Sequence, residues 1–258
     1  AGDVALAELL DHQPLLAFDF DGTLAAIVRQ PRDARPTQAL VQRLAALSAL
    51  LPVAVVSGRA LADLRPRLGF RPAHLVGNHG AEDEDDAAAT ARWTVALDPL
   101  RQRLQQQAAV LGAAGVTPED KGPSIALHYR QARHAAVALR AIELFLQGPW
   151  LDGQAGPLKV FGGKRVVNVC AAGCPDKAAA VQALVARCGA GAALFAGDDV
   201  NDEPVFAAAP PHWLTVRVGR DAVRSQARFG VDSPVEMARL LDRLLALAQA
   251  RRGAAQRG

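Results

Sequence analysis

Short apolar runs that end abruptly at a turn residue recur along this chain of 258 residues, and they limit the folds open to it. Glycine or a polar side chain soon follows each of the clearest runs, which are 15–18, 53–56, 74–76 and 192–196. Apolar runs of this length are typical of buried strands. Segments with helical spacing separate several of them, at about 36–50, 60–68 and 175–189. Strands that alternate with helices favour an α/β fold with a parallel sheet.

The middle of the chain follows a different order, in which a helix is followed by two strands, twice over. Helices are predicted at 99–112 and 132–147, and strands at 115–119, 124–130, 157–161 and 165–170. The last two strands are expected to turn at Gly162-Gly163. This order is typical of a small α+β module with an antiparallel sheet. We therefore expect a Rossmann-like parallel-sheet core formed by 1–98 and 172–258, with an α+β domain inserted at 99–171.

Composition argues against several classes of protein. Half of the residues are hydrophobic and the net charge is +3, which indicates an ordered globular chain. Lys and Arg are scattered, without the aromatic-rich basic stripe of single-strand nucleic-acid binders. Three cysteines argue against a disulfide framework, and no apolar stretch reaches membrane-spanning length. No secretory signal is visible. We expect a cytoplasmic protein, with a monomer favoured, that binds neither nucleic acid nor membrane.

Two carboxylates, Asp19 and Asp21, stand directly after the first apolar run, where Gly22 ends the predicted strand. Side chains alternate along a strand, so the two would share a face if the strand continued. In open α/β sheets, ligand sites form at the carboxyl ends of the strands. Paired charge in such a place is costly unless a partner compensates it, and a hard divalent cation is the usual partner. The alternative is a solvated turn, because Asp-Gly is also a common turn signal.

Three further polar signals lie at other predicted strand ends or helix starts: Ser57, Lys177 and the cluster Asp198-Asp199-x-x-Asp202. Each one alone has an ordinary explanation, as a turn residue, a solvated charge or a helix cap. Their joint occurrence in this order, at the carboxyl ends of strands, predicts a single site.

The residue types in this set suit phosphoryl transfer. A phosphate monoester is negatively charged, so a carboxylate attacks it only when a metal ion and a cation neutralise that charge. We expect Asp19 to be the nucleophile that forms an aspartyl-phosphate, and Asp21 to protonate the leaving oxygen and then activate water. Mg²⁺ is predicted to bind Asp19, Asp198 and the backbone carbonyl of Asp21. Asp199 or Asp202 would act through water or support these ligands.

The phosphate oxygens need hydrogen-bond donors and a counter-charge. Ser57 is predicted to donate to one of these oxygens, together with backbone N–H groups near Gly22 and Gly58. Arg59, which follows directly, is included among the groups that contact the substrate. Lys177 is predicted to neutralise charge on the phosphate or on Asp19.

These residues resemble the four motifs of the haloacid dehalogenase superfamily. The matching segments are Asp-Phe-Asp-Gly-Thr at 19–23, Ser-Gly-Arg at 57–59, Lys177 and Gly-Asp-Asp-x-x-Asp at 197–202. The insert lies between the second and third motifs and resembles the α+β cap domain of the sugar-phosphatase branch. Three longer segments, 77–82, 121–130 and 197–203, are similar to trehalose-6-phosphate phosphatases.

The resemblance implies a cap at 99–171 that closes over a disaccharide phosphate. Asn78, His79 and Glu82 would then lie near the interface between cap and core. The residues facing the sugar from the cap would be Lys121, Ser124, His128 and Arg130. Independently, a strand over 124–130 would put three of these on one face, although that could equally be an ordinary solvent face. Asn168 stands where the family commonly has a sugar-binding Glu; an amide can still donate and accept.

The leading hypothesis is therefore Mg²⁺-dependent hydrolysis of trehalose 6-phosphate. A second phosphatase hypothesis keeps this chemistry and changes the substrate to sucrose phosphate or a glycosyl-phosphoglycerate. A phosphomutase such as phosphomannomutase would share the fold and the intermediate, but it must keep water away. A non-catalytic sensor of sugar phosphates is disfavoured, because a sensor has no need of both Asp19 and Asp21.

Overall fold

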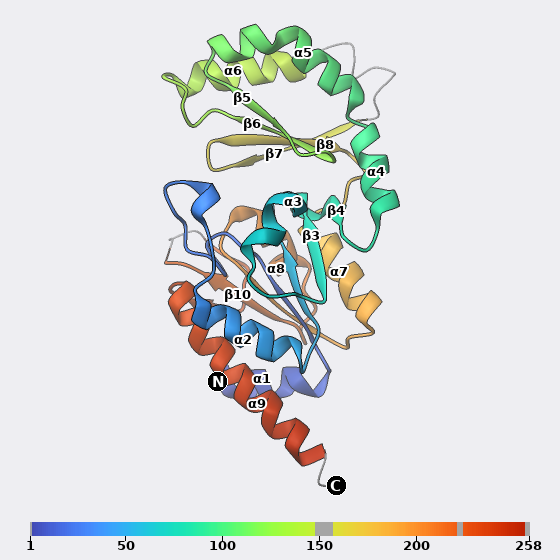
Figure 1. Cartoon of the computed structure of the whole chain (residues 1–258), viewed down its shortest axis with the longest axis vertical. Coiled ribbons are helices and arrows are strands. Elements are labelled where there is room, and N and C mark those ends of the chain that lie inside the picture. Colours follow the sequence, from blue (N-terminus) through green and yellow to red (C-terminus); the bar gives the residue numbers. More distant parts are fainter. Residues whose placement is uncertain (1, 148–156, 221–223, 256–258) are drawn as a thin grey trace. The chain divides into compact units, whose positions relative to one another are not determined.

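The computed structural model describes residues 2–147, 157–220 and 224–255 of the chain. It divides into two compact units, the first formed by Ala1–Gly80 with Pro175–Gly258 and the second by Ala81–Cys174. Figure 1 shows the helices and strands of each unit. The second unit is thus an insertion within the first.

A parallel sheet forms the centre of the first unit. The strand order of the sheet is β11-β10-β9-β1-β2-β3-β4, and every pairing from β11 to β3 is parallel; its last strand, β4, belongs by sequence to the second unit. The strands are β1 (Leu15–Phe18), β2 (Val53–Val56), β3 (His74–Gly77), β4 (Glu82–Asp83), β9 (Ala193–Gly197), β10 (Leu214–Val218) and β11 (Phe229–Val231). The four strands predicted most clearly from sequence are all present. Their shared direction brings their carboxyl ends to one edge of the sheet.

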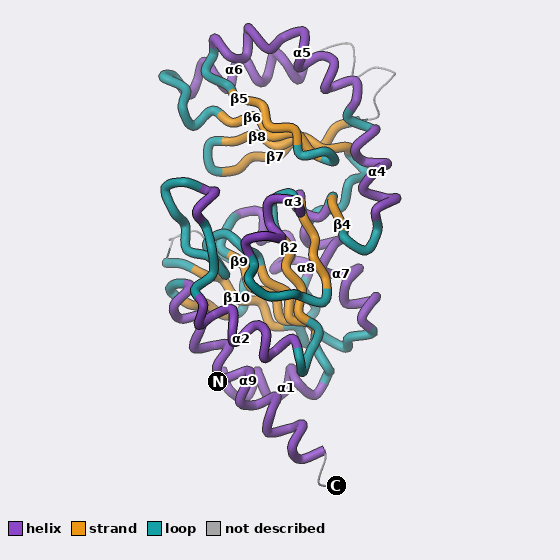
Figure 2. The backbone as a smooth tube through the Cα atoms, in the orientation of Figure 1, coloured by secondary structure: helices purple, strands orange, loops and turns teal. Residues whose placement is uncertain are grey.

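Two groups of helices pack against this sheet, as Figure 2 shows. In one group, α9 (Pro234–Ala255) contacts both α1 (Gly2–Asp11) and α2 (Gln38–Ser48). In the other, α7 (Lys177–Cys188) contacts β1, β2 and α8 (Glu203–Ala208). All residues of β1, β2 and β9 are buried between these layers. The α/β fold expected for the core is confirmed, and its central strands give the loops beyond them a rigid base.

The helix predicted over about 60–68 is shorter in the structure. Helix α3 covers only Leu61–Leu64, and a 3₁₀ turn at Arg65–Arg67 follows it. Pro66 lies inside that turn and has no N–H to donate to a carbonyl one turn earlier, so the α-helix ends there. Further 3₁₀ turns cover Pro31–Asp33, Asn78–Gly80 and Val200–Asp202.

The second unit is an α+β module with an antiparallel sheet in the order β5-β6-β8-β7. Its elements are α4 (Ala87–Val95), α5 (Asp98–Ala113), β5 (Thr117–Asp120), β6 (Ser124–His128), α6 (Ala135–Leu146), β7 (Leu158–Gly163) and β8 (Val166–Ala171). Figure 1 shows α5 and α6 on one side of this sheet, and Ile125, Leu127 and Val169 share a hydrophobic cluster with them. Because side chains alternate along a strand, the neighbouring residues of β6 and β8 face away from this cluster.

Some local features differ from the sequence predictions. The acidic run 82–86 leads into helix α4, which was not predicted, and the Asp86 side chain caps this helix by accepting the Ala89 N–H at 2.9 Å. The turn after β7 falls at 164–165 rather than at Gly162-Gly163, since Gly163 still pairs with Val166. Strand β11 was also not predicted. The units divide at 80/81 and 174/175, whereas we expected boundaries at 98/99 and 171/172.

The first testable prediction concerns the end of α7. Gly189 ends this helix with φ 62° and ψ 24°, a left-handed conformation, and an added Cβ would have open space around it. Gly189→Ala should therefore lower the unfolding free energy by about 1 kcal/mol, through backbone conformation alone. Urea unfolding followed by circular dichroism measures this change.

Gly112→Ala provides the matched control. Gly112 lies within α5 and also has open space for a Cβ, but its φ is not in the left-handed range. This substitution should raise stability by about 0.5 kcal/mol, because alanine restricts the unfolded chain and favours helix. Equal effects of the two variants would contradict the explanation.

Candidate active site

Loops at the carboxyl edge of the parallel sheet bring the predicted residues of the first unit together. Asp19 directly follows β1, Ser57 follows β2 and Asp198 follows β9. Asn78 lies in the 3₁₀ turn after β3, and Lys177 is the first residue of α7. Strand ends in an open α/β sheet are where ligand sites form, so this edge is the candidate active site.

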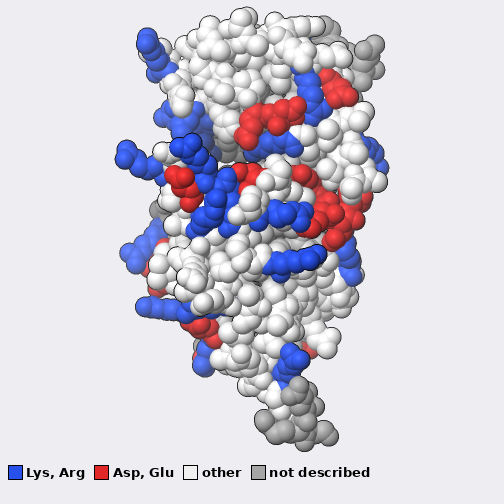
Figure 3. Space-filling model, in the orientation of Figure 1, with Lys and Arg blue, Asp and Glu red and all other residues white. Residues whose placement is uncertain are grey.

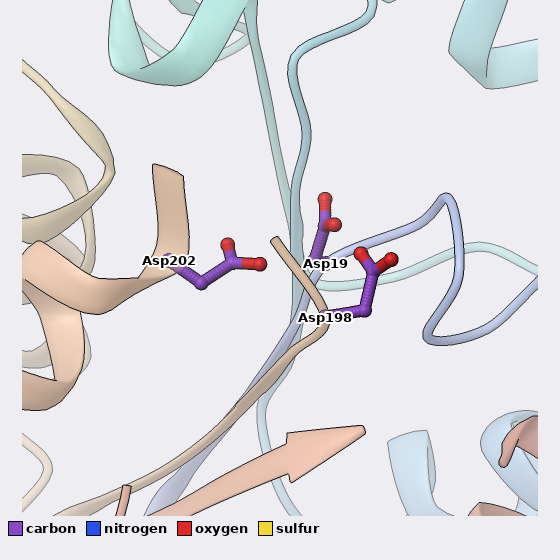
Figure 4. A group of neighbouring side chains, drawn as sticks. All are labelled: Asp19, Asp198 and Asp202. Atoms are coloured by element: carbon purple, nitrogen blue, oxygen red, sulfur yellow. The ribbon is translucent and has the colours of Figure 1, made fainter. Parts of the chain in front are cut away.

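Three carboxylates form the centre of the site. One oxygen from each of Asp19, Asp198 and Asp202 lies within 4.8 Å of the others. Figure 4 shows the carboxylates of Asp19 and Asp198 side by side, with that of Asp202 directed toward them from the 3₁₀ turn at 200–202. The Asp202 side chain is fully buried and that of Asp19 is 6% exposed.

A buried lysine holds two of these carboxylates. Lys177 Nζ lies 2.9 Å from Asp19 Oδ1 and 2.6 Å from Asp202 Oδ1. Burial lowers the pKa of the Lys177 ammonium, but the two carboxylates outweigh it and the net shift is upward. Burial raises the pKa of Asp19 well above its ordinary value; Lys177 opposes that shift, while Asp202 and Asp198 add to it. The single positive charge of Lys177 therefore does not offset the three carboxylates around it.

The imbalance between carboxylate and ammonium charge shows that these residues suit a bound metal ion. Three carboxylates face one ammonium in a largely buried place, and ionising all three would leave an excess of negative charge that a divalent cation would offset. Carboxylate oxygens are the ligands that hard cations such as Mg²⁺ prefer. Asp202 already uses both oxygens, one on Lys177 and one on the backbone N–H of Asp199, at 2.9 Å. Asp19 and Asp198 are the better placed ligands.

Glycines allow the carboxylates to approach the backbone closely. Gly22 has φ 79°, and a Cβ there would lie 2.0 Å from Asp198 Oδ2. A Cβ on Gly197 would lie 2.3 Å from the carboxyl carbon of Asp202. Any larger residue would push these side chains away, so both positions need glycine for steric reasons and Gly22 for its conformation as well.

The turn after β2 is built against the turn after β3. The Ser57 hydroxyl accepts the Arg59 N–H at 3.2 Å and is buried. Asn78 and His79 both have left-handed backbones, with φ of 50° and 58°. The Asn78 N–H donates to the Arg59 carbonyl and the His79 N–H to that of Ser57, at 2.8 and 2.9 Å. A Cβ on Gly58 would lie 2.4 Å from the His79 ring. Non-glycine residues held in the left-handed region, such as Asn78 and His79, cluster at functional sites.

Arg59 was expected to contact substrate, and in the structure it holds Asp21. Its Nε and Nη2 atoms lie 2.6 and 2.7 Å from the two oxygens of Asp21, whose side chain is 42% exposed. Its Nη1 donates to Asp63 Oδ2 at 2.6 Å. Burial raises the pKa of Asp63, but hydrogen bonds from Arg67 and Arg59 outweigh it and the net shift is downward. Sequence reasoning missed Asp63, although its spacing of four from Arg59 was a usable signal.

The residues expected to face a sugar lie in the second unit. Ser124 and Asn168 are buried in β6 and β8. His128 Nε2 lies 2.7 Å from Glu119 Oε2, and Lys121 Nζ lies 3.8 Å from the same oxygen. Glu119, in β5, was not predicted; its pairing with Ala126 of β6 depends on the register of the sheet. Glu82 lies in β4, and Arg130 is exposed in the turn beyond β6.

The surface and the helices bear on the expected partners. On the face shown in Figure 3, Lys and Arg side chains are interspersed with Asp and Glu. Among the helices that the structure describes, none is long and apolar enough to cross a membrane.

Solved structures identify the class of fold. The chain resembles a trehalose-6-phosphate phosphatase related protein, with a TM-score of 0.72, 20% identity and coverage of 92% of this chain and 99% of that one. It also resembles the C-terminal domain of trehalose-6-phosphate phosphatase from C. albicans, with a TM-score of 0.70, 22% identity and coverage of 95% and 96%. BT1666 from Bacteroides thetaiotaomicron, a phosphatase of the haloalkanoate superfamily, matches with a TM-score of 0.61, 16% identity and coverage of 91% and 95%. The fold is that of the haloacid dehalogenase superfamily.

Sequence comparison identifies the family. The trehalose-phosphatase family model matches residues 17–233. The trehalose-phosphate phosphatase of Mycobacterium ulcerans is 32% identical over 274 residues, which cover 95% of this chain and 68% of the relative. That of Mycobacterium tuberculosis is 33% identical over 258 residues, covering 92% and 62%. The chain thus belongs to the trehalose-phosphatase family and spans about two thirds of the length of these relatives. The family predicted from the motifs is confirmed.

The second prediction concerns the buried lysine. Lys177→Met removes the counter-charge of Asp19 and Asp202 and should lower the unfolding free energy by roughly 3–5 kcal/mol in buffer without divalent ions. Urea unfolding measures the change. The double variant Lys177→Met with Asp202→Leu should recover part of it, because one uncompensated charge is gone.

Arg43→Met is the matched control for this prediction. Arg43 makes a bidentate pair with Asp242 in the same unit, but that pair is exposed. Water solvates the Asp242 carboxylate after the substitution, so only a small change is expected. Equal losses in Lys177→Met and Arg43→Met would contradict the role given to burial.

Proposed function

We propose that this chain is a phosphatase that hydrolyses trehalose 6-phosphate to trehalose and phosphate with the help of a divalent cation. The observation that carries this proposal is the buried lysine held between Asp19 and Asp202, with Asp198 beside them. Membership of the trehalose-phosphatase family supports the substrate, and the relatives at 32% and 33% identity are named trehalose-phosphate phosphatases.

The first chemical step belongs to Asp19. Its carboxylate attacks the phosphorus of the sugar phosphate, the bond from phosphorus to the sugar oxygen breaks, and an aspartyl-phosphate forms. Lys177, 2.9 Å from Asp19, favours the ionised carboxylate that this attack requires. Burial strengthens the interaction, because few water dipoles screen it. Ser57, directly after β2, would donate a hydrogen bond from its hydroxyl group to a phosphate oxygen.

Proton transfer belongs to Asp21. Its half-exposed carboxylate lies outside the buried group and so can serve both the leaving group and water. It protonates the departing sugar oxygen, and then takes a proton from the water that hydrolyses the aspartyl-phosphate. Two aspartates two positions apart thereby take different roles because their surroundings differ.

Asp19 and Asp198, with the backbone carbonyl of Asp21, would hold Mg²⁺. When bound, the ion offsets the negative charge that the phosphate brings to a group already rich in carboxylates. Asp202 keeps its hydrogen bond to Lys177. Asp199 is occupied as a cap, since its Oδ1 accepts the Val200 N–H at 2.8 Å. This assignment separates the aspartates that bind metal from those that hold the site in shape.

We assign substrate selection to the second unit, which would act as the cap domain. The cluster of Glu119, Lys121 and His128 offers donors and an acceptor in a small area, as recognition of sugar hydroxyls requires. Asn168 lies on the same sheet, paired with Ala126 of β6. Arg130 would contribute from the turn beyond β6.

The third prediction tests reaction and substrate together. Phosphate release should be fastest with trehalose 6-phosphate, by at least about tenfold in kcat/KM over sucrose 6-phosphate and glucose 6-phosphate. Asp19→Asn should lose roughly a thousandfold or more, because an amide is a poor nucleophile. A phosphate assay with product chromatography makes the measurement.

Two outcomes would change the proposal in different ways. A different sugar phosphate turned over faster would replace the substrate and leave the chemistry standing. An isomerised sugar phosphate without net phosphate release would indicate a phosphomutase and contradict the hydrolytic assignment.

The fourth prediction concerns the metal ion and needs no activity measurement. Mg²⁺ at about 100 times its Kd should stabilise the protein by roughly 2.7 kcal/mol, since it binds the folded state. Asp198→Asn should remove this effect in thermal unfolding. Asp199→Asn should retain it, because asparagine also caps helices well. The reverse result would exchange the roles of the two aspartates.

A further inference from the structure

Asp63 lies between two arginines whose side chains are largely buried. Arg59 Nη1 donates to Asp63 Oδ2 at 2.6 Å, and Arg67 Nη2 donates to Asp63 Oδ1. Arg59 and Arg67 each stand four positions from Asp63, and their side chains are 12% and 9% exposed. The Asp63 carboxylate thus uses one oxygen on each guanidinium.

The same two arginines also reach other parts of the first unit. Arg59 holds both oxygens of Asp21, and its Nη2 donates to the Pro31 carbonyl at 2.8 Å. Arg67 Nη1 donates to the Arg32 carbonyl. Asp63 is therefore the junction of a network that joins α3 to the 3₁₀ turn at 31–33 and to the aspartate assigned to proton transfer.

We propose that Asp63 is a positioning residue for the proton-transfer step: it orients the Arg59 guanidinium, and through it the Asp21 carboxylate. This inference rests on the proposed function, because it takes Asp21 as the residue that protonates the leaving oxygen. Asp63 hydrogen-bonds to Arg59, and Arg59 in turn holds Asp21, so Asp63 acts on the reaction through Arg59.

The geometry of the guanidinium explains how this works. A guanidinium is planar and presents its N–H groups in a fixed fork, so the direction of Nη1 determines the direction of Nε and Nη2. Asp63 fixes Nη1, and the edge formed by Nε and Nη2 then meets Asp21 in a bidentate pair. Without Asp63, Arg59 loses one of its two carboxylate partners and that fixed direction. When one Asp21 oxygen carries the proton to be donated, the other still accepts a hydrogen bond from Arg59. A proton donor displaced by about 1 Å transfers its proton far less often.

The test uses the leaving group, because only poor leaving groups need a proton. Departure of a sugar alkoxide requires protonation, whereas 4-nitrophenolate leaves without it. kcat/KM reports the steps up to formation of the aspartyl-phosphate, so the later hydrolysis step does not enter the comparison.

The fifth prediction is that Asp63→Asn lowers kcat/KM for trehalose 6-phosphate by roughly tenfold and for 4-nitrophenyl phosphate by less than about twofold. Asp21→Asn should show the same pattern with a larger loss on the sugar phosphate. Asp63→Glu, which retains a carboxylate for both arginines, should restore part of the rate. Asp242→Asn is the matched control, since it disrupts another bidentate Asp–Arg pair of the first unit. It should leave kcat/KM unchanged for both substrates.

The outcomes separate positioning from simple structural support. Equal losses on both substrates, with Asp63→Glu failing to help, would mean that Asp63 only holds the fold, and the inference would be overturned. Unchanged rates in Asp63→Asn would overturn it as well. If the wild-type protein hydrolyses 4-nitrophenyl phosphate but not trehalose 6-phosphate, the proposed substrate has failed. The comparison then uses the alkyl phosphate that the protein hydrolyses fastest.

Discussion

The ion pairs of Lys177 are the interaction on which the rest of the site depends. A lysine and two carboxylates are taken out of water together, and each charge is tolerated only because the others are there. Such a group needs a rigid scaffold around it, and the fully buried strands β1 and β9 provide one. Helix α7 places Lys177 at its first residue, with Asp176 accepting the Ala179 N–H at 3.0 Å as its cap. The fold thus fixes the positions of the charged side chains, and the folded state is stable only while these charges remain paired.

The two units carry different parts of the proposed activity. All three carboxylates of the buried group and the lysine come from the first unit, where parallel strands end at one edge. The second unit contributes a different chemistry: Glu119 and His128 lie on an antiparallel sheet, Lys121 lies in the turn between β5 and β6, and together they could match hydroxyl groups. An enzyme built in this way can keep one reaction while the inserted unit determines its substrate. Asn168, expected to stand where the family commonly has a sugar-binding Glu, would be a change of this second kind.

Several residues of the candidate site could be predicted from the sequence because they follow a local signal. Asp19, Ser57 and Asp198 stand where a short apolar run ends, and runs of that kind are readable without knowledge of packing. The partner of Arg59 was not predictable in this way, because the bidentate pair with Asp21 joins residues 38 positions apart through their side chains. Glu119 was missed because only the strand register brings it near His128. Helix α4 was missed because its cap, Asp86, lies in an acidic run that resembles a loop.

The contrast between Asp19 and Asp21 suits the two roles proposed for them. A nucleophile works best where water is excluded and its charge is poorly solvated, and the Asp19 side chain is 6% exposed. A proton carrier must receive a proton from water and give it to the leaving group, and the Asp21 side chain is 42% exposed. An exposed carboxylate is also free to move, which costs precision. The pair with Arg59 offsets that cost, because it gives a solvent-accessible side chain one defined direction, and Asp63 and the 31–33 turn give Arg59 its own.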